Sequence, residues 1–88
     1  MKIDYHREFQ KNYLKRIKCN RNLNQIFHEK VILFVEDLHN PLLKDHALVG
    51  KQRGLRSFSI TGDVRVVYRP IKKNLVLFLD IGSHNQVY

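Results

Sequence analysis

The sequence predicts a small α+β domain in which two helices cover one face of a mainly antiparallel sheet. The chain has 88 residues and 43% hydrophobic residues, enough for one core but not for two. Apolar residues recur at helical spacing in its first half and alternate as in strands in its second half. We therefore expect a single domain over residues 1–88, with the element order β-α-α-β-β-β.

The N-terminal half predicts a short strand and two helices. Residues 2–5 alternate enough for a strand, and apolar side chains then recur every three or four positions, which predicts a first helix over about residues 7–19. A second helical pattern runs from Leu23 to Leu38, and Pro41 should end it. Because only a few residues join the two helices, we expect them to form an antiparallel pair with one shared apolar face.

The C-terminal half predicts an antiparallel meander. Its strands are GLRSFSI (54–60), VRVVYR (64–69) and LVLFLDI (75–81), with turns at 61–63 and 70–74. Alternation in the middle strand places Arg65 on the face away from the core, together with Ser57 and Ser59 of the strand before it. The helices should leave this second face partly exposed, with the loop 44–54 and the C-terminal tail folded over it. Arg65 either pairs with a carboxylate such as Asp80 or is available to bind a phosphate.

Positive charge is concentrated in two blocks of the chain. Sixteen Lys and Arg against eight Asp and Glu give a net charge of +8, of which residues 1–22 contribute +5 and residues 44–73 contribute +6. This distribution favours a polyanionic partner such as nucleic acid, although a merely solvated surface can look the same. The candidate contact residues are Lys11, Lys15, Arg16, Lys18, Lys44, Lys51, Arg53, Arg56 and Arg69.

Several classes of protein are disfavoured by the same sequence. The longest apolar runs, VILFV and LVLFL, are far shorter than the roughly 20 residues of a membrane span. The N-terminus lacks the apolar block of a signal peptide, so we expect a cytoplasmic protein with no membrane partner. The single cysteine, Cys19, has no disulfide partner, and neither a glycine-rich phosphate loop nor a metal-ligand motif is present. We expect no cofactor and no bound metal.

The polar residues around the meander include the groups needed to cleave RNA without a metal. His46 lies in a basic loop and His84 follows the last strand, and an imidazole can accept or donate a proton near neutral pH. In this reaction a base takes the proton of a ribose 2′-OH, whose oxygen attacks the adjacent phosphate. A cation such as Arg65 stabilises the developing charge, and an acid protonates the 5′-oxygen. The substrate would be RNA, because DNA lacks the attacking hydroxyl.

Three blocks follow one another along the second half of the chain: KDHALVGKQRGLR, DVRVVYR and GSHNQVY. In this order they resemble the RelE/ParE superfamily of toxins, and most closely its YafQ-like branch of ribosome-dependent mRNA interferases. The resemblance implies a small RelE-like fold and the toxin of a type II toxin–antitoxin pair, which inhibits translation by cleaving mRNA on the ribosome without metal. It implies that His46 and His84 are the catalytic histidines, that Asp63 is an active-site aspartate, that Arg65 acts on the scissile phosphate and that Tyr88 stacks on or orients the RNA.

The resemblance also implies partners. These are the ribosome, its mRNA and a cognate antitoxin. The antitoxin would be acidic or amphipathic and dimeric, and operator DNA would be bound only through it. The basic residues named above would hold RNA and the ribosome.

The sequence departs from this branch at three positions. Ser59 stands where a second histidine is usual, Ser57 where an aspartate is usual, and Val64 where a tryptophan often follows the aspartate. Because serine is neither an acid nor a base near pH 7, proton transfer would fall to His46 and His84. Two alternatives stay open: a ParE-like toxin that inhibits DNA gyrase by binding, and a catalytically weak RNA-binding relic of the family.

Overall fold

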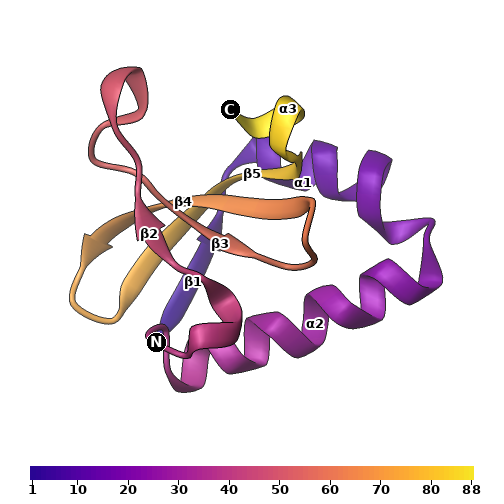
Figure 1. The fold of residues 1–88 in the computed structure, drawn as a ribbon, viewed down its shortest axis with the longest axis horizontal. Coiled ribbons are helices and arrows are strands. Elements are labelled where there is room, and N and C mark those ends of the chain that lie inside the picture. Colours follow the sequence, from indigo (N-terminus) through magenta and orange to yellow (C-terminus); the bar gives the residue numbers. More distant parts are fainter.

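A computed structural model describes all residues, 1–88, as one five-stranded sheet with three helices (Figure 1). The strands are β1 (Lys2–Tyr5), β2 (His46–Ala47), β3 (Arg56–Ser59), β4 (Val64–Lys72) and β5 (Leu75–Ser83). The helices are α1 (Arg7–Tyr13), α2 (Arg21–Glu36) and α3 (His84–Val87), with a π-helical segment η1 (Leu14–Lys18) and 3₁₀ turns η2 (Pro41–Leu43) and η3 (Gly50–Gln52).

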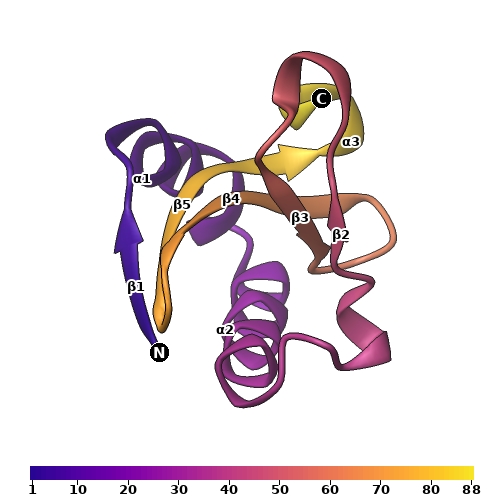
Figure 2. The same cartoon turned by 90° about the vertical axis from the view of Figure 1, so that its left-hand side faces the viewer.

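The sheet has the strand order β1-β5-β4-β3-β2, so the last strand of the sequence lies next to the first. β1 runs parallel to β5, and all other neighbours are antiparallel. Figure 2 shows α2 across one face of the sheet and α1 beside β1 and β5. The predicted α+β class and the mainly antiparallel sheet are confirmed.

The helices begin and end close to the predicted positions, with small corrections. The first helix runs without a break from Arg7 to Lys18, but its last turn is the π-helical segment. The side chain of Asn20 accepts the backbone N–H of Leu23 at 3.1 Å and so caps α2. α2 ends at Glu36, earlier than the apolar pattern predicts, because the chain turns extended at Asp37 before Pro41 is reached.

The strands differ more from the prediction. β4 continues through Pro70 to Lys72, and the turn predicted over 70–74 is only Lys73 and Asn74, which has a positive φ of 64°. Pro70 is tolerated because the pairing of β4 with β3 stops at Tyr68, so the missing N–H removes no bond on that side. β2 and α3 were not predicted, since two and four residues are too few to show a periodicity.

The core lies between α2 and the sheet. Phe34 of α2 is fully buried, stacks on Phe58 at a ring distance of 4.5 Å and meets Tyr68 edge-on at 5.0 Å. Phe78 of β5 contacts the same cluster at 5.7 Å from Phe34. Each such side chain contributes about 1.5–3 kcal/mol when fully buried. Neither α2 nor any shorter helix has the length and apolar content needed to cross a membrane.

Candidate active site

The face of the sheet opposite α2, here called the outer face, carries two rows of directly opposed residues. One row is His46, Ser57, Val67 and Asp80, and the other is Ser59, Arg65 and Gly82. Opposed residues of neighbouring strands point to the same side, so both rows share one surface. This face is less exposed than predicted, because Ser57, Ser59 and Val67 are buried. Figure 1 shows α3 and the C-terminus at the end of the sheet where β5 finishes, with the loop between β2 and β3 nearby.

Arg65 lies on the outer face with no acidic partner. Its Nη1 donates to the Ser59 hydroxyl at 2.8 Å, and its Nη2 to the carbonyl of Gly62 at 3.3 Å. Its Nε is buried and has no hydrogen-bond partner. The predicted alternative, a pair with Asp80, does not form, because that carboxylate pairs with Arg16 at 3.4 Å. The guanidinium charge is therefore held in place without being neutralised.

The C-terminal helix places the second predicted histidine near the same surface. The Tyr88 hydroxyl donates to the Ser57 hydroxyl, and the His84 ring meets the Tyr88 ring edge-on at 4.6 Å. The backbone N–H of His84 lies 3.4 Å from the Asp63 carboxylate. These contacts link three of the predicted site residues in a chain that ends on the sheet.

The position of His46 is determined by the two residues before it. Lys44 has a left-handed φ of 50°, and its carbonyl oxygen lies 3.0 Å from Nδ1 of His46. A carbonyl can only accept, so Nδ1 carries the proton and Nε2 of the neutral ring keeps a free lone pair. His46 is exposed and lies opposite Ser57.

Asp45 anchors this loop, and the sequence did not indicate this role. Its side chain is only 4% exposed. It accepts hydrogen bonds from the Tyr68 hydroxyl at 2.8 and 3.0 Å and from Arg56 Nε at 3.4 Å. Burial, together with the hydrogen bond to Asp45 and its charge, raises the pKa of Tyr68, so the phenol remains a donor. From the sequence alone, an aspartate in a loop is expected to be solvated. The only feature that pointed to Asp45 was its position directly before His46.

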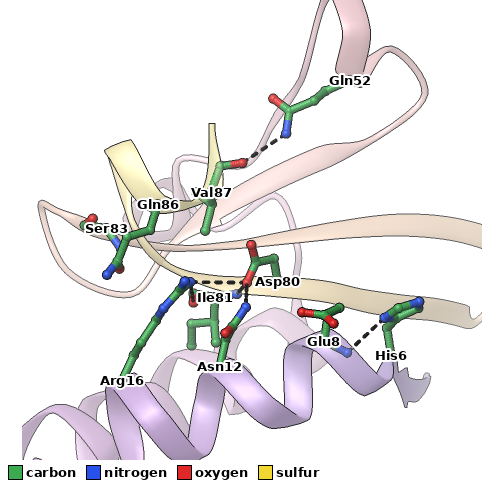
Figure 3. Close-up of polar contacts among 10 residues, drawn as sticks. All are labelled: His6, Glu8, Asn12, Arg16, Gln52, Asp80, Ile81, Ser83, Gln86 and Val87. Atoms are coloured by element: carbon green, nitrogen blue, oxygen red, sulfur yellow. Dashed lines mark hydrogen bonds and ion pairs between the residues drawn. The ribbon is translucent and has the colours of Figure 1, made fainter.

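A second polar cluster ties the first helix to β5 (Figure 3). Asp80 accepts from Asn12 Nδ2 at 2.7 Å, and Arg16 Nη1 donates to the carbonyl of Ile81 at 3.0 Å. Gln52 donates to the carbonyl of Val87 at 3.0 Å and so holds α3 from the opposite side. Asn12, Asp80 and Gln52 gave no sequence signal for these roles, because the roles depend on how distant segments meet.

Two of the predicted basic contact residues are engaged inside the protein. Arg16 pairs with Asp80 and Arg56 with Asp45, each at 3.4 Å. The others are exposed and form no ion pair: Lys11, Lys15, Lys18, Lys44, Lys51, Arg53 and Arg69. The first helix, formed by α1 and η1, lies on one side of α3, and the loop between β2 and β3 lies on the other side (Figure 1). Arg69 is further along β4, toward its hairpin with β5.

No three His, Cys, Asp or Glu side chains gather in a way that could hold a metal ion. Cys19 is exposed and stands alone. The polar groups that the outer face and its surroundings offer are imidazole, guanidinium, carboxylate, phenol and hydroxyl groups.

Comparison with known proteins places this geometry in a family. Residues 1–88 match the family model described as the bacterial toxin of a type II toxin–antitoxin system, YafQ. A search of curated proteins found no match.

Three solved structures illustrate the similarity of the fold. A copper-bound mutant toxin from Helicobacter pylori is 28% identical, with a TM-score of 0.75 over 100% of this chain and 99% of that chain. YafQ from E. coli strain BL21(DE3) is 22% identical, with a TM-score of 0.79 over 99% and 97%. The toxin–antitoxin complex DinJ-YafQ of E. coli matches at 22% identity and a TM-score of 0.73 over 99% and 96%.

Proposed function

The chain belongs to the YafQ family of type II toxins, and from this premise we propose that it is an mRNA endonuclease that acts on the ribosome and inhibits translation. One observation carries the proposal: the Arg65 guanidinium has no acidic partner and shares the outer face with His46, near α3, which begins at His84 and is followed by Tyr88. A partly buried guanidinium without a counterion carries a desolvation cost, which a bound anion would offset. A phosphodiester has the charge and the paired oxygens to do so.

In the proposed reaction, His46 is the general base. Its Nδ1–H is directed to the Lys44 carbonyl at 3.0 Å, which leaves Nε2 to take the proton of the ribose 2′-OH. The freed oxygen attacks the adjacent phosphorus, and the bond from phosphorus to the 5′-oxygen breaks. The products are a 2′,3′-cyclic phosphate and a new 5′-hydroxyl end.

The remaining groups stabilise the charge and the leaving group. Arg65 neutralises the charge that develops on the non-bridging oxygens, and His84 gives a proton to the departing 5′-oxygen. Tyr88 offers a ring on which a base can stack, and Asp63 holds the backbone of His84. Each step has a side chain assigned to it, so the proposal includes no metal.

The main test is cleavage of mRNA on purified ribosomes, mapped by primer extension. His84→Ala and Arg65→Ala should each lower the cleavage rate by about 10² to 10⁴ and relieve growth arrest on expression. Lys72→Ala, a change on the same strand as Arg65 but outside the site, should keep both activities. If both site variants stay fully toxic while folded, the assignment of these residues is wrong.

A metal requirement is tested separately, because crystal structures of toxins from Helicobacter pylori with the same fold are described as copper-bound in one case and metal-bound in another. Chelators of copper and zinc that leave the Mg²⁺ of the ribosome untouched should not change the cleavage rate. A rate that falls on chelation and returns with added copper would contradict the metal-free mechanism.

The alternative function, inhibition of DNA gyrase, is tested by the order of events after expression. DNA damage before any stop in protein synthesis would favour gyrase inhibition.

We also propose that the chain binds a cognate antitoxin, since E. coli YafQ forms a complex with DinJ. The antitoxin would be acidic or amphipathic, because the toxin carries a net charge of +8. Binding should suppress cleavage, and operator DNA would be contacted only through the antitoxin. Co-expression with the protein encoded beside this gene, followed by copurification, tests the pairing.

A further inference from the structure

Ser59 lies directly opposite Arg65 in the β3–β4 pair, on the same outer face. Its hydroxyl accepts Nη1 of Arg65 at 2.8 Å, a short bond from a charged donor. Ser59 is only 5% exposed. It is therefore too enclosed to meet a bound RNA, and any effect on a ligand has to pass through the arginine.

The other neighbours of Arg65 leave the guanidinium with little else to hold it. Nη2 reaches only the Gly62 carbonyl, at 3.3 Å, and Nε is buried without a partner. On the β5 side the residue opposite is Gly82, which has no side chain to offer. The Ser59 hydroxyl is thus the one side-chain group that orients the guanidinium.

We propose that Ser59 is a positioning residue, which holds Arg65 so that the remaining N–H groups of Nη1 and Nη2 meet a phosphate. This inference rests on the proposed function, and it changes the role of a position at which the resemblance suggests missing machinery. Serine contributes no proton transfer. Its hydroxyl instead keeps the Arg65 guanidinium in one orientation, a role that no carboxylate fills here. Because the hydroxyl is neutral, the positive charge of Arg65 is not cancelled.

The test compares Ser59→Ala, which removes the hydroxyl, with Ser59→Thr, which restores it. The first readout is the NMR signal of the Arg65 Nε–H group during titration with inorganic phosphate. In the wild type this signal should move on titration. In Ser59→Ala the phosphate affinity should fall severalfold and the signal should broaden, and Ser59→Thr should recover both.

Ser57→Ala provides the matched control. It removes a buried hydroxyl two residues earlier on the same strand and face, but one that contacts Tyr88 and not Arg65. It should shift the Tyr88 resonances and leave the Arg65 signal and its response to phosphate as in the wild type. If Ser59→Ala does not fold, Ser59→Cys, which keeps the size and weakens the acceptor, replaces it.

The second readout is kinetic. With ribosome-bound mRNA, Ser59→Ala should lower kcat about tenfold or more while KM changes little, because the misplaced arginine acts on the reacting phosphate. Equal phosphate binding in Ser59→Ala and wild type, or no phosphate binding in the wild type, overturns the inference. If phosphate binding depends on Ser59 but the wild type cleaves no mRNA, the positioning role stands and the proposed function fails.

Discussion

Asp45 is almost sealed from solvent although the next residue, His46, is exposed. Its carboxylate is held by the phenol of Tyr68 and by Arg56, two groups on neighbouring strands. The exposed His46 is therefore held in position by the buried side chain of the residue before it. Removal of one partner of such an anchor leaves a buried polar group unsatisfied, which costs about 1–3 kcal/mol.

This anchor predicts a loss of stability at high pH. Burial and Asp45 raise the pKa of Tyr68 above its ordinary value of about 10. Above that pH the unfolded chain loses the phenolic proton and the folded chain keeps it. The contribution of this phenol to the free energy of unfolding should therefore be constant up to about pH 9 and should be lost as the pH rises beyond about 10.

Urea denaturation of the wild type and of Tyr68→Phe across this range checks the prediction. Tyr68→Phe should be less stable by about 1–3 kcal/mol at pH 7 and should lose the part of the alkaline slope that this phenol causes. Tyr5→Phe, which changes an exposed tyrosine, should keep the whole slope. An unchanged slope in Tyr68→Phe would show that another group is responsible.

Among the elements, α3 depends on a close approach to β5. A Cβ at Gly82 would lie 2.6 Å from Oε1 of Gln86 and 2.8 Å from Nη1 of Arg16. Gln86 also accepts the backbone N–H of Ser83 at 2.7 Å and so forms half of the capping box that starts α3. A larger residue at position 82 would therefore displace the ends of these two side chains.

Gly82→Ala should therefore separate stability from activity. Both crowded atoms belong to flexible side chains, so the fold should survive with a loss of about 1–3 kcal/mol. The displaced Gln86 loosens α3, which carries His84, and mRNA cleavage should fall severalfold. Gly62→Ala is the control, since a Cβ there meets no atom within 4 Å and the carbonyl bonded to Arg65 remains. Equal loss of cleavage in both variants would contradict the role assigned to α3.

The sequence predicted the elements that show a repeating pattern of apolar residues. It did not predict the side-chain contacts that form between segments far apart in the chain. The alternation of Val64, Val66 and Tyr68 predicted β4, and the outer-face position of Arg65 followed from it. The partner of Arg65 could not be predicted from this alternation. Whether Asp80 or Ser59 contacts it depends on the strand register and on the pairing of Arg16 with Asp80. α3 is too short to show a period, so its contact with the sheet through Tyr88 was not foreseeable in detail.

At the scale of the whole molecule, the exposed lysines on the first helix should hold the ribosome by charge. Ribosome binding should weaken steeply with salt, since each phosphate contact releases counterions. Lys11, Lys15 and Lys18 form no ion pair, so changing all three to Gln should weaken binding and reduce the salt slope.

Cosedimentation with ribosomes over a series of KCl concentrations measures this slope. Changing Lys72 and Lys73 to Gln removes two exposed charges, one fewer than the helix variant, from the β4–β5 hairpin, away from α3. This variant should keep most of the wild-type slope. If both variants lose it equally, binding depends on net charge and not on the face around α3.

The pairing of β1 with β5 has a consequence for synthesis of the protein. β5 lies between β1 and β4, and residues as distant as Lys2 and Leu75 are partners. β5 is the last strand to leave the ribosome, so during translation the sheet stays incomplete and its core side chains stay uncovered. A chain interrupted before residue 75 lacks β5 and α3, so we expect that it does not form the surface on which Arg65 and Tyr88 lie. On the proposed function, premature termination should then yield an inactive fragment and not a partly active one.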